Sequence, residues 1–190
     1  MTIKELIELG RKNGKETRLT NYVITRLGTV DNYLHAINKP TDKLIRDEVA
    51  AELHFPQTLV THFDECNGGS LYCASATCIG INLFGCTPRQ SKLNRKLDDD
   101  WPPIDIRRSN RPGTHYIIFA SYGFDASLVL VNRRDQTVRC CLGRDLSKTR
   151  QEWTSIEEWL GSEIDRLANL FTPEGLCLVK CEDLVPRKRH

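Results

Sequence analysis

The stretch LHFPQTLVTHFDECNGGSL, residues 53–71, decides the fold. Pro56 suits the first turn of a helix, where a missing backbone N–H costs nothing. Three apolar residues then recur at the spacing of one helix face: Leu59, Phe63 and Cys66. Asn67, Gly68 and Gly69 follow as residues that tolerate the left-handed backbone in which helices end. The stretch predicts a short helix with a marked start and stop, and we expect Gly68 or Gly69 to have a positive φ.

Length and composition predict one globular domain. A chain of 190 residues with 39% apolar content can bury roughly 70% of the surface that it exposes when unfolded. The formal charge of +2 and the pI near 8.1 are too mild to indicate a duplex nucleic-acid partner, which usually needs a concentrated basic face. Residues 1–9 mix charges with apolar positions, which is typical of neither a signal peptide nor a membrane span. We therefore expect a cytoplasmic protein.

Helices are expected before the Pro56 helix. Residues 1–28 contain an amphipathic pattern and an ambiguous Tyr22–Ile24 run, and we interpret them as an N-terminal helical extension. From Thr29, apolar residues up to Ile37 mark a second helical face. Thr41 and Asp42 cap a third helix. Its apolar face consists of Ile45, Val49 and Leu53.

An antiparallel sheet is predicted after Gly69. Residues 70–73 and 78–84 are rich in residues that favour strands, so each is expected to form a short strand. Three further strands are expected within residues 115–142, and Gly123 lies in the turn between the first two of them. Ser155 and Glu158 then form a capping box, and Trp159 lies in the helix that follows. One apolar stripe runs along this helix: Ile156, Leu160, Ile164, Leu167 and Phe171. The pattern predicts an α+β fold with a mostly antiparallel sheet packed against helices.

The connection over residues 87–113 is the segment that we expect to bind a partner. It is long, and long irregular connections are commonly functional or mobile. It carries Trp101 between both signs of charge, and binding residues concentrate on loops held by a rigid scaffold. The candidate partner-binding residues are Trp101, Asp98, Asp99, Asp100, Arg107 and Arg108. A mobile insertion without a partner is the competing interpretation.

The order of these motifs resembles the SUKH superfamily, the Smi/Knr type of domain. The resemblance spans residues 41–171 and rests on the Pro-started helix, the strands around 117–123 and 128–132, and the terminal helix from 155. The motif residues are Pro56, Asn67, Gly68, Gly69, Gly123, Ser155, Glu158 and Trp159. It implies a SUKH-like domain over 29–175, followed by a C-terminal tail over 176–190.

The resemblance implies protein binding without catalysis or a cofactor. Bacterial members are typically immunity proteins that bind and neutralise polymorphic toxins, many of them nucleases, and fungal relatives act as interaction hubs. An immunity protein is therefore the expected function, with an intracellular adaptor as the alternative. The mild positive charge of the chain does not fit this function well, because an acidic surface complements the basic site of a nuclease better.

Metal binding, catalysis and nucleic-acid binding remain as less favoured alternatives. The eight cysteines mostly lack paired zinc-ligand spacing, and without a secretory signal we expect reduced thiols. His54 and His62 frame the Pro56 helix near Cys66 and Cys73, which leaves open a metal site or a Cys/His pair. A nucleic-acid or other anionic partner is the last alternative. Its basic surface would consist of Arg89, Lys92, Arg95, Lys96, Arg107, Arg108 and Arg111, but acidic residues interrupt this series.

Overall fold

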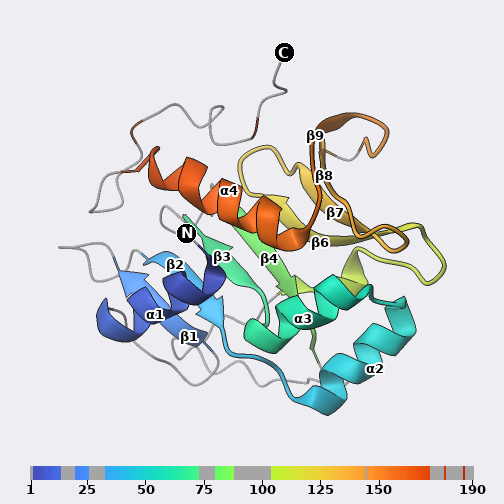
Figure 1. The fold of residues 1–190 in the computed structure, drawn as a ribbon, viewed down its shortest axis with the longest axis horizontal. Coiled ribbons are helices and arrows are strands. Elements are labelled where there is room, and N and C mark those ends of the chain that lie inside the picture. The colour runs from blue at the N-terminus through green and yellow to red at the C-terminus, as the bar shows by residue number, and fades with distance from the viewer. Residues whose placement is uncertain are drawn as a thin grey trace.

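A computed structural model describes residues 2–13, 20–25, 33–72, 80–87, 104–143 and 145–171, together with residues 178 and 186. Figure 1 shows helices packed against a twisted sheet. The elements are α1 (Ile3–Asn13), β1 (Thr20–Thr25), β2 (Tyr33–Asn38), α2 (Lys43–Leu53), α3 (Gln57–Glu65), β3 (Gly69–Leu71), β4 (Ile81–Gly85), β5 (Ile104–Asp105), the 3-10 turn η1 (Ile106–Arg108), β6 (Tyr116–Tyr122), β7 (Leu128–Asn132), β8 (Val138–Cys141), β9 (Thr149–Trp153) and α4 (Ile156–Ala168).

The sheet is almost entirely antiparallel. Its strand order is β1-β2-β3-β4-β6-β7-β8-β9, and every neighbouring pair in that order is antiparallel. The short β5 pairs in parallel with the end of β4. In Figure 1, α1, α3 and α4 lie in front of the strands. The predicted α+β class with a mostly antiparallel sheet is confirmed.

The predicted helix signals act at the expected residues. The side chain of Asp42 caps α2 by accepting the N–H of Leu44 at 2.7 Å. Pro56 stands at the N-cap of α3, and the three apolar residues of the predicted helix face are buried. The hydroxyl of Ser155 accepts the N–H of Glu158 at 3.1 Å, while the Glu158 carboxylate accepts the N–H of Thr154 at 2.7 Å. The Glu158 side chain therefore binds the backbone N–H of the residue before the N-cap, and not that of the N-cap residue Ser155 itself.

The two glycines after α3 have the predicted positive φ, but they do not end the helix, because α3 stops at Glu65 and its C-cap residue Cys66 is extended, with φ −155°. Gly68 has φ +75° and Gly69 has φ +142°. A Cβ atom on Gly68 would lie 2.6 Å from the carbonyl oxygen of Leu83, and one on Gly69 would collide with the carbonyl of Ala36. These positions therefore need glycine both for the backbone turn and for the close approach of β3 to its neighbours.

The predicted helix that ends at Ile37 is wrong for residues 33–37, which form β2. His35 and Ile37 are buried on the core side of the sheet, and Ala36 between them is also buried. Burial on both faces removes the alternation that marks a strand in the sequence. β1 pairs with β2 as an edge strand, so residues 20–25 continue the sheet and residues 1–28 are not a purely helical extension.

The strand β9 was missing from the sequence prediction. Its residues include Arg150, Gln151 and Glu152, which resemble a polar loop more than a strand. β9 is the last strand of the described sheet order, and its pairing with β8 is irregular around Arg150. Charges and a bulge are typical of edge strands because they discourage pairing with another chain.

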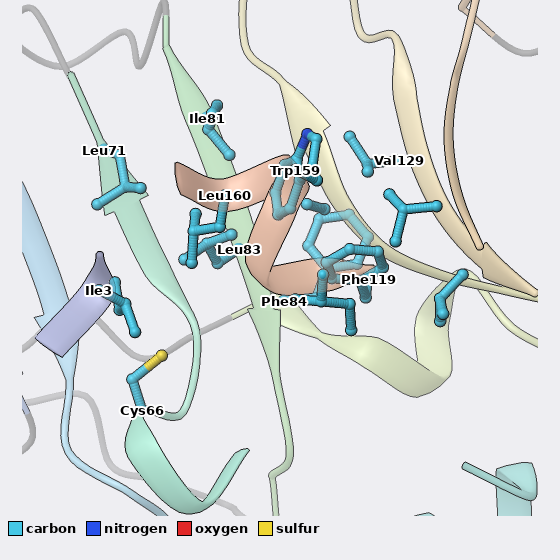
Figure 2. Close-up of a cluster of buried hydrophobic side chains, with 14 of the residues drawn as sticks. Ile3, Cys66, Leu71, Ile81, Leu83, Phe84, Phe119, Val129, Trp159 and Leu160 are labelled. Atoms are coloured by element: carbon cyan, nitrogen blue, oxygen red, sulfur yellow. The ribbon is translucent and has the colours of Figure 1, made fainter. Parts of the chain in front are cut away.

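The core lies between α4 and the middle of the sheet. Figure 2 shows Trp159 and Leu160 of α4 close to Leu83, Phe119 and Val129 of the strands. The indole ring of Trp159 is fully buried and meets the ring of Phe119 edge to face, with centroids 5.1 Å apart. This packing fixes α4 across the sheet.

One buried polar cluster links α4 to β6. The hydroxyl of Tyr122 donates to the carboxylate of Glu163 at 2.7 Å, and the guanidinium of Arg166 contacts the same carboxylate at 2.6 Å. Glu163 is only 2% exposed, so these partners satisfy a charge that would otherwise destabilise the fold.

No helix within the described ranges is both long and apolar enough to cross a membrane.

Candidate partner-binding surface

Three neighbouring helices carry an excess of exposed carboxylates. α3 contacts both α2 and α4, and Figure 1 shows α3 between the other two helices. The exposed acidic residues on these helices and at their caps are Asp42, Asp47, Glu48, Asp64, Glu157, Glu158 and Asp165. Lys43 is the exposed lysine or arginine of the same elements. We call this surface the acidic helical face.

Two arginines beneath this face, Arg46 and Arg107, are largely buried and form ion pairs with carboxylates of the same chain. Arg46 is 9% exposed and contacts the carboxylates of Asp47, at 2.7 Å, and Asp64. The Arg107 side chain is 12% exposed and lies 3.2 Å from Asp105 and within 4 Å of carboxylates on α2. Among the described residues, these two arginines therefore lie beneath the carboxylates, and the outermost charges of the three helices are mostly negative, although the chain as a whole has a formal charge of +2.

A crevice of about 180 Å³ opens between α1, α3 and α4. Its apolar lining consists of Ile3, Ile156 and Leu160, of which Ile3 and Leu160 are labelled in Figure 2. Gly161 of α4 also lines the crevice. The polar lining includes Thr61, His62, Glu65, Glu157 and Lys4.

The electrostatics of the crevice are set by its carboxylates. The ammonium of Lys4 lies 3.0 Å from the carboxylate of Glu65. Within the described ranges no cation pairs with Glu157, whose carboxylate accepts a hydrogen bond from the hydroxyl of Thr58 at 3.5 Å. Burial lowers the pKa of His62 to about 4, despite the opposing effect of Glu157. The imidazole is therefore neutral near pH 7, and Glu157 is the lining carboxylate that has no cationic side-chain partner among the described residues.

A second exposed surface lies at one end of the β6–β9 meander. Phe124 is 46%, Leu142 40% and Leu146 45% exposed, on the β6–β7 and β8–β9 turns. The guanidinium of Arg150 lies 2.9 Å from Asp125 and so links β9 to the β6–β7 turn. Exposed apolar side chains on rigid turns can serve as contacts, but single ones are also common on ordinary surfaces.

The predicted partner-binding residues are only partly described. Trp101, Asp98, Asp99 and Asp100 lie outside the described residues, and so do the basic positions Arg89, Lys92, Arg95 and Lys96. Arg108 is exposed. Arg107 is not an open contact residue, because its guanidinium is held by the carboxylates named above and by the carbonyl of Thr87. Its role in the structure is to join η1 to α2 and to the end of β4.

The acidic helical face was not predicted from the sequence. Residues 42–65 carry six carboxylates and two basic side chains, so a charge count for each predicted helix indicates an acidic surface there. The overall charge of the chain conceals it. The contribution of α4, more than ninety residues later in the chain, depends on the tertiary structure.

The metal site and the Cys/His pair considered from the sequence can be checked at the described residues. Among them, no three His, Cys, Asp or Glu side chains come together as a metal site. The Sγ atom of Cys66 lies 3.8 Å from Nε2 of His62, but burial raises the pKa of that thiol to about 12, which suppresses the thiolate. His54 is exposed at the end of α2, and Cys73 is outside the described ranges. The Cys/His contact is therefore a core contact.

The fold defines an α+β protein with a mostly antiparallel sheet. Comparison of the chain with protein-family models, with curated proteins and with solved structures gives no match.

Proposed function

We propose that this chain is a non-catalytic protein-binding domain, an immunity protein of the SUKH type that binds and neutralises a toxin through the acidic helical face. The observation that carries the proposal is the concentration of seven exposed carboxylates on α2, α3 and α4, with Arg46 buried beneath them. The order of sequence motifs supports the same class of domain.

The chemistry of the partner follows from the charge of this surface. A toxin that cleaves nucleic acid must contact phosphates with lysine and arginine side chains. An acidic surface complements such a basic site, speeds association and excludes the nucleic acid that would otherwise occupy it. Neutralisation then needs occlusion alone, and no covalent step or cofactor.

The experiment is affinity capture with the purified chain as bait, with the products encoded immediately upstream and downstream of it supplied as candidate partners. We expect a basic protein whose toxic activity is inhibited at a stoichiometry of one to one. Calorimetry at low and high salt is expected to show weaker binding at high salt, because ions screen the charges that attract the two surfaces.

Two charge reversals locate the interface. Asp165→Lys changes the acidic helical face at an exposed position of α4. Glu152→Lys makes the same charge change on β9, where the side chain lies beside Arg139 and away from the core-facing Val138 and Cys140. We expect Asp165→Lys to weaken binding and Glu152→Lys to leave it unchanged. Equal effects of the two variants, or capture of no basic partner, contradict the proposal.

A further inference from the structure

The crevice between α1, α3 and α4 has the size of one side chain. Its volume of about 180 Å³ is below the roughly 300–1,000 Å³ of sites that hold drug-sized ligands. It is close to the roughly 150 Å³ of an apolar cavity that accepts a benzene ring. A partner protein can fill such a space with one anchoring residue, and residues of this kind carry much of the binding energy of an interface.

The lining of the crevice selects the chemistry of that residue. The floor is apolar, since Ile3, Ile156 and Leu160 line it. Glu157 stands at the rim, exposed and without a cationic partner among the described residues. The positive charge of Lys4 is opposed by Glu65 at 3.0 Å. A fitting occupant therefore has an apolar stem and a positively charged end.

We propose that the crevice accepts an arginine side chain of a basic partner protein. Its aliphatic stem packs on the apolar floor, and its guanidinium donates to the carboxylate of Glu157. This inference rests on the proposed function and names the anchor residue of that interface.

Arginine fits this lining better than the other common anchors. Its planar guanidinium can donate two N–H groups to one carboxylate, whereas lysine presents a more strongly hydrated point charge. A tryptophan or tyrosine side chain would fill the space, but it would leave Glu157 without a countercharge. Arginine, tryptophan and tyrosine are the residues enriched among interface anchors.

The direct test uses N-acetyl-arginine amide as a probe, in a titration followed by NMR spectroscopy of the ¹⁵N-labelled chain. N-acetyl-citrulline amide is the control, because it has nearly the same shape without the charge. We expect saturable shifts of the Thr61, Glu157 and Gly161 amide signals with the arginine probe, and at least about tenfold weaker binding of the citrulline probe, the factor that a loss of about 1.4 kcal/mol gives. Equal binding of both probes, or shifts outside the crevice, overturns the proposal.

Two variants on one turn of α4 test the position of the probe. Gly161→Leu fills the crevice, whereas Ser162→Leu adds the same side chain at the next, exposed residue. We expect Gly161→Leu to abolish binding of the arginine probe and Ser162→Leu to retain it. Thermal melting shows whether both variants fold. Retained binding by folded Gly161→Leu overturns the proposal.

Glu157→Gln provides a test without a change in side-chain size. The variant removes the charge and keeps the shape of the rim, so we expect the preference for arginine over citrulline to disappear. A preference that persists in Glu157→Gln overturns the inference, even if Gly161→Leu does not fold.

The captured partner separates this inference from the proposed function. Binding that is weakened by Asp165→Lys but insensitive to Gly161→Leu and Glu157→Gln overturns the arginine anchor and leaves the proposed function intact. If the arginine probe binds the crevice but no basic protein is captured, the proposed function fails and the crevice remains a site for a guanidinium group.

Discussion

The side-chain carbonyl oxygen of Gln136 accepts a hydrogen bond from the backbone N–H of Thr58 at 3.0 Å. Thr58 lies in the first turn of α3, where the N-cap residue Pro56 makes no side-chain capping bond. Gln136 lies on the turn between β7 and β8, 78 residues later, and has φ +63°. A strand turn therefore supplies the cap that the helix lacks.

Gln136→Ala is expected to destabilise the protein by about 0.5–2 kcal/mol, because α3 loses its capping acceptor. Chemical denaturation measures the free energy of unfolding. Arg134→Ala, on the same turn and exposed, is the control and should change stability by less than about 0.5 kcal/mol. Equal stability of the Gln136 variant and the parent would show that water replaces the cap at no cost.

Gly68→Val is expected to cost more stability than Gly113→Val. Both glycines have similar positive φ values, +75° and +81°, and the strain of a side chain in that region costs about 1–3 kcal/mol. Only Gly68 adds a steric collision, since its Cβ would lie 2.6 Å from the Leu83 carbonyl oxygen, whereas nothing lies within 4 Å of a Cβ on Gly113.

The difference between the two valine variants isolates the collision, which we expect to add about 1–3 kcal/mol. Unfolding free energies from denaturant titration give both values. Identical losses would mean that β3 shifts away from β4 without resistance, contrary to the tight approach seen at this corner.

Stability is expected to fall as the pH drops below about 6.5, in part through two buried histidines. Burial lowers the pKa of His62 to about 4 and that of His35 to about 3. Nδ1 of His35 also accepts the N–H of Tyr72 at 3.3 Å, which requires an unprotonated nitrogen. The unfolded chain binds protons at a higher pH than the folded chain, so this stabilisation is complete above pH 6.5 and is lost during acidification.

Each of these histidines contributes a slope of about 1.4 kcal/mol per pH unit between pH 6.5 and its folded pKa. His62→Gln should therefore flatten the dependence of unfolding free energy on pH between 6.5 and about 4. The parent chain, measured at the same series of pH values, is the reference. If the slope is the same in His62→Gln and in the parent, the His62 imidazole binds its proton at the same pH in the folded and unfolded chains, which contradicts the expected effect of burial.

The four cysteines in the described ranges are expected to be unreactive in the folded protein: Cys66, Cys86, Cys140 and Cys141. All four are buried, and burial raises the pKa of each thiol, to about 12 for the first three. Alkylation with iodoacetamide near pH 7, followed by peptide mass spectrometry, should modify none of them in the folded chain. After denaturation without a reductant, all four should react, and a protected thiol at that stage would contradict the expectation of free thiols.

Local sequence signals predicted much of the fold. Asp42, Pro56 and Ser155 mark helix starts because capping and the proline ring act on residues only a few positions away. The turns within residues 115–142 predicted the β6–β7–β8 meander for a similar reason, since hairpins join strands that are adjacent in the chain. β2 was not predicted, for two reasons. Its partner strand β3 begins more than thirty residues later in the chain, and burial of both faces hides the alternation of apolar and polar residues that marks a strand.

The sequence by itself determined the start of α3, the capped α4 with its apolar stripe, and the α+β class. Only the tertiary structure decided that Gln136 caps α3, that Arg107 is buried against α2, and that Glu157 stands beside a crevice formed by three helices. The division has a physical basis. Capping, turn formation and amphipathic periodicity act over a few residues, whereas the charge of a surface and the shape of a crevice arise only when the chain buries apolar area and brings distant helices together.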